Sequence, residues 1–70
     1  MAWTDFKGKQ VFIVIETSKG DRRYSGVVNE VTYIGKNING IETYFIEIID
    51  KFNFKVGFNS TQIKVMEEEI

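Results

Sequence analysis

The feature that most constrains the fold of this chain is a series of short runs of β-branched and aromatic residues, separated by turn-like segments. Val11, Ile13 and Ile15 alternate with residues of the opposite face, which is the pattern of a strand. The runs of this kind are 11–16, 22–34, 43–49, 54–58 and 63–66. No run has the period of a long amphipathic helix, and the chain holds no proline. The sequence therefore predicts an all-β fold of five antiparallel strands.

The segments between these runs carry turn residues, and one run carries an internal glycine. Asn39-Gly40 is a strong hairpin signal because both residues tolerate positive φ. Gly26 lies inside the second run, where a glycine is typical of a sharp bend or a close backbone approach. A small barrel needs one strand to bend between the two halves of its sheet. We therefore predict a small, strongly bent five-stranded barrel of the SH3 or Sm type, with an open OB barrel as the alternative.

The chain is predicted to form one domain over residues 1–70, with a distinct segment at each end. Residues 1–8 are predicted to contain a short helical turn, in which Trp3 and Phe6 share a face. We interpret these two side chains as an apolar plug over one mouth of the barrel, with a stacking platform for a base as the alternative. Residues 67–70 are interpreted as a solvated acidic tail, because three glutamates stand together there.

Several classes of function are disfavoured by the residues that the chain lacks. It has no cysteine and no histidine, which excludes disulfides and thiolate metal sites and removes the commonest general base. Glu47 and Asp50 lie three residues apart in a strand, and this spacing places them on opposite faces, so they cannot act as a pair. Because there is also no phosphate-binding glycine loop and no metal-ligand spacing, we expect neither an enzyme nor a cofactor or metal site.

The charge and hydropathy of the chain limit its partners. No apolar run approaches the roughly 18 residues of a membrane helix, and the first residues do not resemble a signal peptide. We therefore expect a cytoplasmic protein with no membrane partner. The net charge of −1 argues against duplex DNA as a ligand, because strong duplex binders make many Lys and Arg contacts to phosphate.

Three blocks of the sequence resemble the Sm-like family, which includes the Sm and Lsm proteins and bacterial Hfq. Val11–Ile15, followed by Gly20, Tyr24, Gly26 and Val28, resembles the first Sm motif. The segment 45–50 resembles the family strand that ends in an acidic residue, and the segment 58–63 is similar in spacing to the second Sm motif. The resemblance covers Lys9 to Met66.

The chain departs from this family at positions that the resemblance would assign to uridine binding. Thr32 stands where the family has an Asp, and the loop that follows is longer than in the family. Asn59 stands where the family has Arg, and Ser60 where it has Gly. The tyrosine-lysine-histidine signature of Hfq is absent, since the chain has no histidine.

The resemblance implies that the fourth strand of one copy pairs with the fifth strand of the next in a ring of five to seven subunits. An isolated barrel of this size leaves strand edges with unpaired N–H and C=O groups, and a chain this short gains stability from a partner. A heterologous contact of this kind closes into a ring if the rotation permits. The interface residues predicted from strict strand alternation are Phe54, Val56, Phe58, Ile63 and Val65. The alternative is a monomer whose aromatic side chains fill its own core.

In such a ring, the loop after the second strand and the corner after the fourth face the pore, where single-stranded RNA is read by stacking and by hydrogen bonds to splayed bases. The predicted RNA-binding residues are Tyr33, Lys36, Asn37, Asn59 and Ser60. Tyr33 would stack, Lys36 would meet a phosphate and Asn59 would read a base edge. In the alternative interpretation Tyr33 is a core residue, Asn37 caps a turn and Asn59 shapes the corner. A second hypothesis for function is a structural or protein–protein ring without nucleic acid, which the acidic composition favours.

Overall fold

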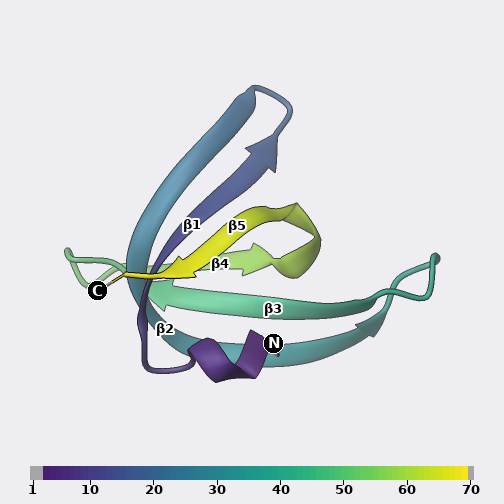
Figure 1. The fold of residues 1–70 in the computed structure, drawn as a ribbon, viewed down its shortest axis with the longest axis horizontal. Coiled ribbons are helices and arrows are strands. Elements are labelled where there is room, and N and C mark those ends of the chain that lie inside the picture. The colour runs from purple at the N-terminus through teal and green to yellow at the C-terminus, as the bar shows by residue number, and fades with distance from the viewer. Residues whose placement is uncertain (1–2, 70) are drawn as a thin grey trace.

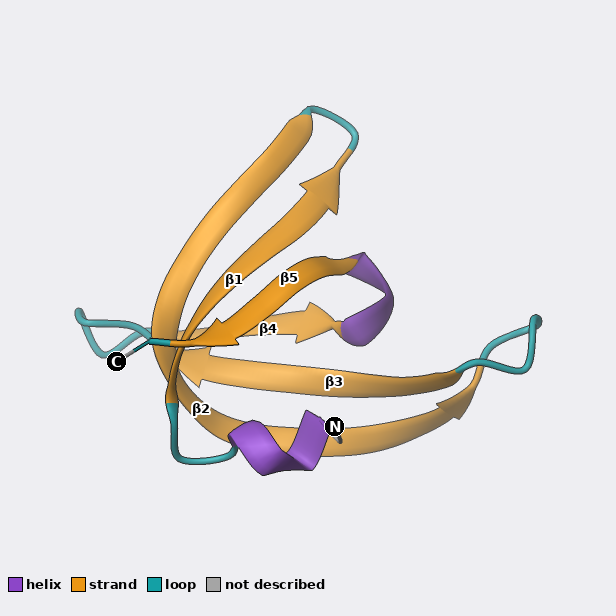
Figure 2. Ribbon diagram, viewed as in Figure 1, coloured by secondary structure: helices purple, strands orange, loops and turns teal. Residues whose placement is uncertain are grey.

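A computed structural model describes residues 3–69, and these residues form five antiparallel strands and two short 3-10 helices (Figures 1 and 2). The elements are η1 (Trp3–Phe6), β1 (Gln10–Thr17), β2 (Gly20–Lys36), β3 (Glu42–Ile49), β4 (Lys55–Asn59), η2 (Ser60–Gln62) and β5 (Ile63–Glu68). The strands lie in one sheet in the order β4-β3-β2-β1-β5. The predicted all-β fold with an N-terminal helical turn is confirmed.

β2 is the longest strand, and its curvature shapes the whole sheet (Figure 1). Its first part pairs with β1, from Gln10 opposite Val27 to Thr17 opposite Gly20. Its second part pairs with β3, from Val27 opposite Ile49 onward. Gly26 lies where the two halves meet, and a Cβ atom there would be only 2.6 Å from the carbonyl oxygen of Ile49. The close backbone approach predicted at Gly26 is therefore present.

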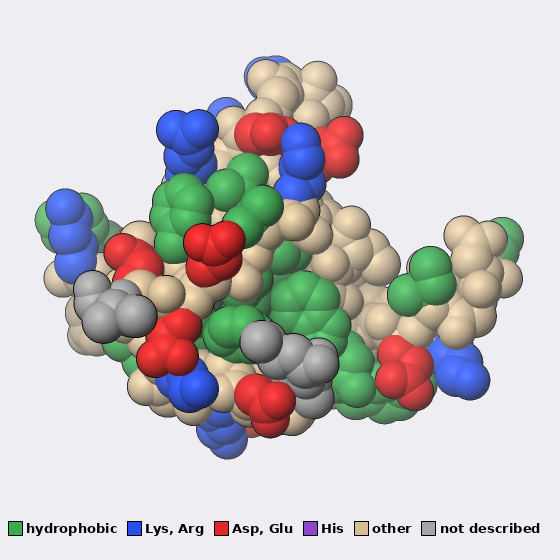
Figure 3. Space-filling view, in the orientation of Figure 1, with side chains coloured by type: hydrophobic (Ala, Val, Ile, Leu, Met, Phe, Trp, Pro, Cys, Tyr) green, Lys and Arg blue, Asp and Glu red, His purple; other side chains and the backbone are tan. Residues whose placement is uncertain are grey.

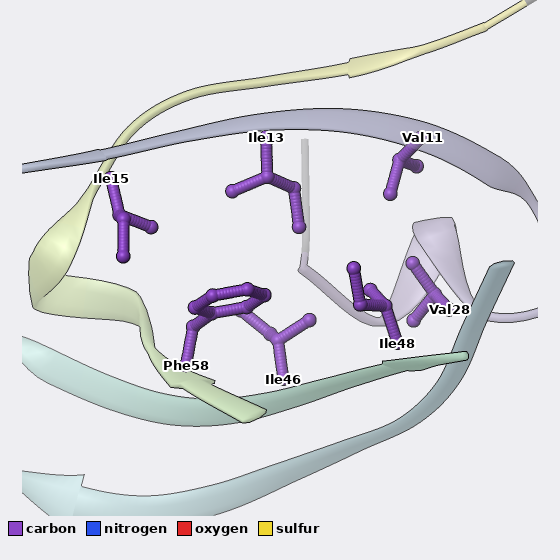
Figure 4. Close-up of a cluster of buried hydrophobic side chains, with 7 residues drawn as sticks. All are labelled: Val11, Ile13, Ile15, Val28, Ile46, Ile48 and Phe58. Carbon is purple, nitrogen blue, oxygen red and sulfur yellow. The ribbon is translucent and has the colours of Figure 1, made fainter. Parts of the chain in front are cut away.

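The core lies inside the curved sheet and is formed by aliphatic side chains from β1, β2 and β3 together with one aromatic from β4 (Figure 4). Its buried members are Val11, Ile13, Ile15, Val28, Ile46, Ile48 and Phe58. Burying an aliphatic or aromatic side chain of this size stabilises a fold by about 1.5–3 kcal/mol. Trp3 and Phe6 pack against the same cluster, in agreement with their interpretation as an apolar plug.

Strict alternation fails in β5, where the pairing with β1 shifts register between Val14 and Ile15. Because of this bulge, Ile63 lies opposite Ile15 and Met66 lies opposite Ile13, so both face the core. Val65 lies opposite Val14 on the other face and is 38% exposed. The prediction that Ile63 and Val65 share a face is wrong, because a bulge adds one residue to one strand and reverses the faces beyond it.

Two boundaries differ from those expected from the sequence. Phe54 belongs to the turn before β4, where the Asp50 carboxylate accepts hydrogen bonds from the N–H groups of Phe52 and Phe54. β5 continues through Glu68, so Glu67 and Glu68 are strand residues and not part of a tail. Closure of a barrel remains a prediction, because β4 and β5 are not neighbours in the strand order of residues 3–69. In this part of the chain no helix has the length and apolar character needed to cross a membrane.

Candidate assembly edges and loop site

β4 forms one edge of the sheet, and its pairing with β3 fixes which backbone groups face outward. In the turn before β4, the N–H of Asp50 donates to the carbonyl of Phe54 at 3.0 Å, which makes these two residues a hydrogen-bonded pair. Hydrogen-bonded pairs alternate along an antiparallel ladder. Val56 and Phe58 therefore direct their backbone groups toward β3, while Lys55 and Gly57 direct theirs toward the free edge.

β5 forms the opposite edge, and the same reasoning applies to it. The N–H of Glu69 donates to the carbonyl of Gln10 at 2.8 Å, so these residues form a hydrogen-bonded pair in the β1–β5 ladder. By alternation, Val65 and Glu67 face β1. Met66 and Glu68 consequently present their backbone N–H and C=O groups at the free edge of β5.

The interface residues predicted from the sequence lie on the expected strands, but most do not point outward. Phe58 is only 4% exposed and its ring contacts the tilted ring of Tyr24 at a centroid distance of 4.8 Å, so its side chain belongs to the core of its own chain. Val56 and Ile63 are half-buried against that core, whereas Phe54 and Val65 are exposed. The prediction that Phe58 offers its side chain to another copy is wrong.

Sequence reasoning missed Lys55, Gly57, Met66 and Glu68 as the edge residues. These edge residues can be identified only when it is known which residues form hydrogen-bonded pairs with the neighbouring strand. A bulge, or a turn that is longer or shorter by one residue, reverses which residues direct their backbone groups to the free edge. Gly57 does carry a sequence signal, since a glycine inside a strand often marks a close approach. A Cβ atom at Gly57 would lie 2.1 Å from the ring of Phe45, so this ring lies directly across the strand.

A groove lies beside the β5 edge, between that strand and η1. Its lining consists of Asp5, Phe6, Lys9, Met66, Glu67 and Glu68, and a smaller hollow lined by Trp3, Phe6, Ile63, Lys64 and Met66 shares two of these residues with it. Hydrophobic side chains gather in the middle of this face, with acidic and basic side chains around them (Figure 3). Lys9 Nζ lies 3.4 Å from Glu68 Oε1, in an exposed ion pair. We call this surface the η1–β5 groove.

The predicted RNA-binding residues form two groups, of which one is compact. Tyr33 and Tyr44 are cross-strand neighbours whose rings meet edge to face at a centroid distance of 5.2 Å. The buried hydroxyl of Ser60 accepts a hydrogen bond from the N–H of Tyr44 at 2.9 Å. Tyr44, which the sequence did not single out, therefore connects Tyr33 with Ser60. Tyr33 is 51% exposed, which overturns its interpretation as a core residue.

The two asparagines use their side-chain oxygens to hold turns. Asn37 Oδ1 accepts hydrogen bonds from the N–H groups of Asn39 and Ile41, and Asn59 Oδ1 accepts from the N–H of Thr61. Asn59 thereby caps η2, while its own N–H donates to the side chain of Gln62 at 3.3 Å. The interpretation of Asn37 as a turn cap and of Asn59 as the residue that shapes the corner is confirmed.

Lys36 and Asn37 lie apart from the corner. The hairpin of β2 and β3 extends well beyond η2, and its tip carries these two residues (Figure 1). Lys36 pairs with Glu42 in the β2–β3 register and is exposed. The structure therefore brings Tyr33 close to Ser60 and Asn59 but places Lys36 and Asn37 farther along the hairpin.

One ion pair connects β5 with the tip of the β1–β2 hairpin. Lys64 Nζ lies 3.0 Å from Asp21 Oδ2, and the hydrogen bond and negative charge of Asp21 raise the pKa of Lys64 above its ordinary value. No cluster of three or more acids within residues 3–69 is arranged to hold a metal ion.

Comparison of the chain with models of known protein families, with curated proteins and with solved structures gave no match. The resemblance to the Sm-like family therefore remains a prediction based on the blocks of the sequence described above.

Proposed function

We propose that this protein is a divergent Sm-like module that assembles with copies of itself into a closed ring and binds single-stranded RNA at its pore-facing loops. The observation that carries the proposal is the strand order, which leaves β4 and β5 as the two edges of one sheet. Each edge can extend the sheet by backbone hydrogen bonds to another copy. Because the two edges are different, pairing one with the other is heterologous, and such a contact closes into a ring when the rotation between copies permits.

A proline substitution at the edge of β4 tests the assembly without removing a bond inside the chain. The N–H of Lys55 faces away from β3, so Lys55→Pro removes an edge donor and leaves the β3–β4 ladder intact. Lys55→Ala is the matched control, because it removes the same side chain and keeps the N–H. Native mass spectrometry is expected to show rings for the unmodified protein, rings that need a higher protein concentration for Lys55→Ala, which keeps the N–H, and smaller species for Lys55→Pro. A monomer at all concentrations for the unmodified protein would refute the proposal.

The RNA part of the proposal is supported by the exposure of Tyr33 and Lys36 on one hairpin. An exposed aromatic ring can stack on any base, and stacking contributes about 1–3 kcal/mol per base. Binding of labelled oligo-U and oligo-A should therefore weaken in Tyr33→Ala and survive in Tyr33→Phe. Ile34→Ala is the matched control, because Ile34 is the neighbouring residue, is 53% exposed and carries neither a ring nor a charge. Affinity should also fall as salt is raised.

A second candidate function, a ring that contacts only protein, is favoured by a specific observation. The side-chain oxygens of Asn37, Asn59 and Ser60 already accept backbone hydrogen bonds in the folded chain. These residues have less capacity left for reading a base than the sequence suggested. A ring that binds neither oligonucleotide at low salt would establish this second function over the first.

A further inference from the structure

The η1–β5 groove borders the free edge of β5, and its composition suggests what it accepts. Phe6 and Met66 supply apolar surface, while Asp5, Glu67 and Glu68 supply negative charge beside it. Lys9 also lines the groove and pairs with Glu68, so acidic side chains still outnumber basic ones there. A ligand that fits this groove would combine an apolar ring with a cation. The β4 edge of the same sheet carries an apolar ring and a cation on one face, as the orientations of its side chains show.

On β4, Val56 and Phe58 turn their side chains toward the core, so Lys55 and Gly57 lie on the outer face of the sheet. On β5 the edge residues have the opposite orientation. Met66 pairs with the buried Ile13, and Glu68 pairs with Val11 in the same ladder, so both lie on the core-side face.

If β5 of a neighbouring copy pairs antiparallel with β4 of the first copy, the sheet of the neighbour is inverted, so that its core-side and outer faces are exchanged. In the strand order β4-β3-β2-β1-β5 every neighbouring pair is antiparallel, so β4 and β5 have the same sense along the sheet. Adding a second copy with β5 antiparallel to β4 therefore requires that the second sheet be inverted. The outer face of β4 then continues into the core-side face of the next β5, where the η1–β5 groove lies.

The outer face of β4 carries an aromatic ring that lies over the strand. Phe45 comes from β3, is 41% exposed, and lies across Gly57 so closely that no Cβ atom would fit between them. Because Gly57 has no side chain, the ring extends over β4 toward the free edge. Lys55 stands on the same face as this ring.

We propose that the η1–β5 groove of one copy receives Phe45 and Lys55 of the next copy, with the ring against Phe6 and Met66 and the ammonium group beside the glutamates. This inference rests on the proposed ring and names the side chains that would form its contact. Its support is the continuity of the groove with the β5 edge and the match of an aromatic–cation pair to an apolar–acidic surface.

The proposal fixes the register of the intermolecular ladder. Residues whose backbone groups face outward must oppose one another, so Gly57 can lie opposite Met66 or two residues to either side. With Gly57 opposite Met66, Lys55 lies opposite Glu68, which forms a cross-strand pair of opposite charges. A shift by two residues places Gly57 opposite Lys64 or Glu68 instead and removes this charge pair. We therefore assign the first register.

Disulfide trapping between two singly substituted chains tests this register, since the natural chain has no cysteine. Lys55→Cys and Glu68→Cys are prepared separately, mixed and exposed to oxidised glutathione. Opposed residues of a hydrogen-bonded pair have Cα atoms about 5.5 Å apart, which suits a disulfide. We expect covalent dimers on a non-reducing gel from the mixture and none from either variant alone. The off-register control mixes Lys55→Cys with Met66→Cys, because the register with Gly57 opposite Lys64 would place Lys55 opposite Met66. In the assigned register these two sites are offset by two residues, about 7 Å along the strand, in addition to the spacing between the strands, which is too far for a disulfide.

A second measurement addresses the aromatic contact. Phe45→Ser is expected to raise the dissociation constant of the ring about tenfold or more, as loss of a central aromatic anchor does. Ile38→Ser is the matched control, because Ile38 is 99% exposed and lies in the turn between β2 and β3. Circular dichroism of each variant confirms that the strands are retained.

Each outcome decides a separate point. Trapping in the 55/68 mixture alone, together with weakened assembly of Phe45→Ser, supports the proposal. Trapping in the 55/66 mixture overturns this inference and leaves the proposed ring standing. The same holds for rings that give no trapped dimer and tolerate Phe45→Ser. An unmodified protein that stays monomeric in native mass spectrometry refutes both.

Discussion

Two substitutions of Asn59 separate its structural role from a role in RNA binding. Asn59 Oδ1 accepts hydrogen bonds from the N–H of Thr61 at 3.2 Å and from the Thr61 hydroxyl at 2.9 Å, and so caps η2. Asn59→Ala removes this acceptor. Asn59→Ser keeps a neutral side-chain oxygen at a position where serine caps helices about as well as asparagine. Both variants lose the amide NH2 group of Asn59, but only Asn59→Ala also loses the oxygen acceptor.

The expected loss of stability follows from the cap. Replacing a helix-capping residue by alanine costs about 0.5–2 kcal/mol. A domain of this size changes its melting temperature by about 4–8 °C for each kcal/mol. Asn59→Ala should therefore melt measurably below the unmodified protein, whereas Asn59→Ser should stay within about 0.5 kcal/mol of it.

Urea unfolding followed by the fluorescence of Trp3 provides the assay, because Trp3 is the only tryptophan and packs against the core. All proteins are compared at one concentration, since association contributes to apparent stability. Binding of labelled oligo-U is measured on the same samples. Unchanged RNA affinity in Asn59→Ser would show that Asn59 only shapes the corner, and a loss of affinity with intact stability would show that its amide reads the base.

The capping argument is refuted if Asn59→Ala unfolds at the same urea concentration as the unmodified protein. It is also refuted if Asn59→Ser is destabilised as much as Asn59→Ala, because the loss would then come from something other than the oxygen acceptor.

Three further predictions concern the fold. Phe58→Ala should cost about 3–5 kcal/mol, as truncation of a buried phenylalanine does, which is a large share of the roughly 4–10 kcal/mol expected for a chain of 70 residues; a thermal melt within a few degrees of the unmodified protein would contradict this. Gly26→Ala should destabilise the bend, because its Cβ atom would lie 2.6 Å from the carbonyl oxygen of Ile49, and an unchanged urea midpoint would show that the backbone can shift there. The raised pKa of Lys64 means that its pair with Asp21 stabilises the fold below the ordinary lysine pKa of 10.5 and is lost as the pH rises through the higher folded value. Nitrogen-detected NMR titration of Lys64 should therefore show its pKa falling in Asp21→Asn, and no change would refute the assignment.

The class of fold could be predicted because local patterns determine it. Alternating aliphatics in β1, the Asn39-Gly40 signal and the glycine in β2 each specify a local geometry, and the structure has a strand, a hairpin turn and a close backbone approach at these places. The turn differs in detail from the expected one, because the N–H of Gly40 donates to the carbonyl of Asn37, so that Ile38 and Asn39 are its central residues and only Gly40 of the predicted pair has a positive φ. Gly40, for example, has a φ of 76°, a left-handed conformation that glycine adopts without strain. These signals act over a few residues, so they can be read without knowing the rest of the fold.

The faces of the edge strands could not be predicted because they depend on single-residue shifts. The bulge opposite Val14 and Ile15 lets Ile63 and Met66 share the core-side face, which strict alternation assigns to Ile63 and Val65. The sequence contains no residue at this bulge that marks it. The turn before β4 has a similar effect, because it includes Phe54 and thereby sets which backbone groups of the strand face outward.

The hydrogen bonds of the loops also limit how RNA could be recognised. The oxygens of Asn37 and Asn59 hold their own turns, and the Ser60 hydroxyl holds the N–H of Tyr44. Base-edge reading by these residues would therefore have to use the remaining donors. Tyr33 is free of such a constraint, since its ring contacts Tyr44 only by one edge-to-face pair and remains half exposed. Because stacking on an aromatic ring tolerates any base, a ring of this protein that binds RNA should distinguish oligo-U from oligo-A only weakly.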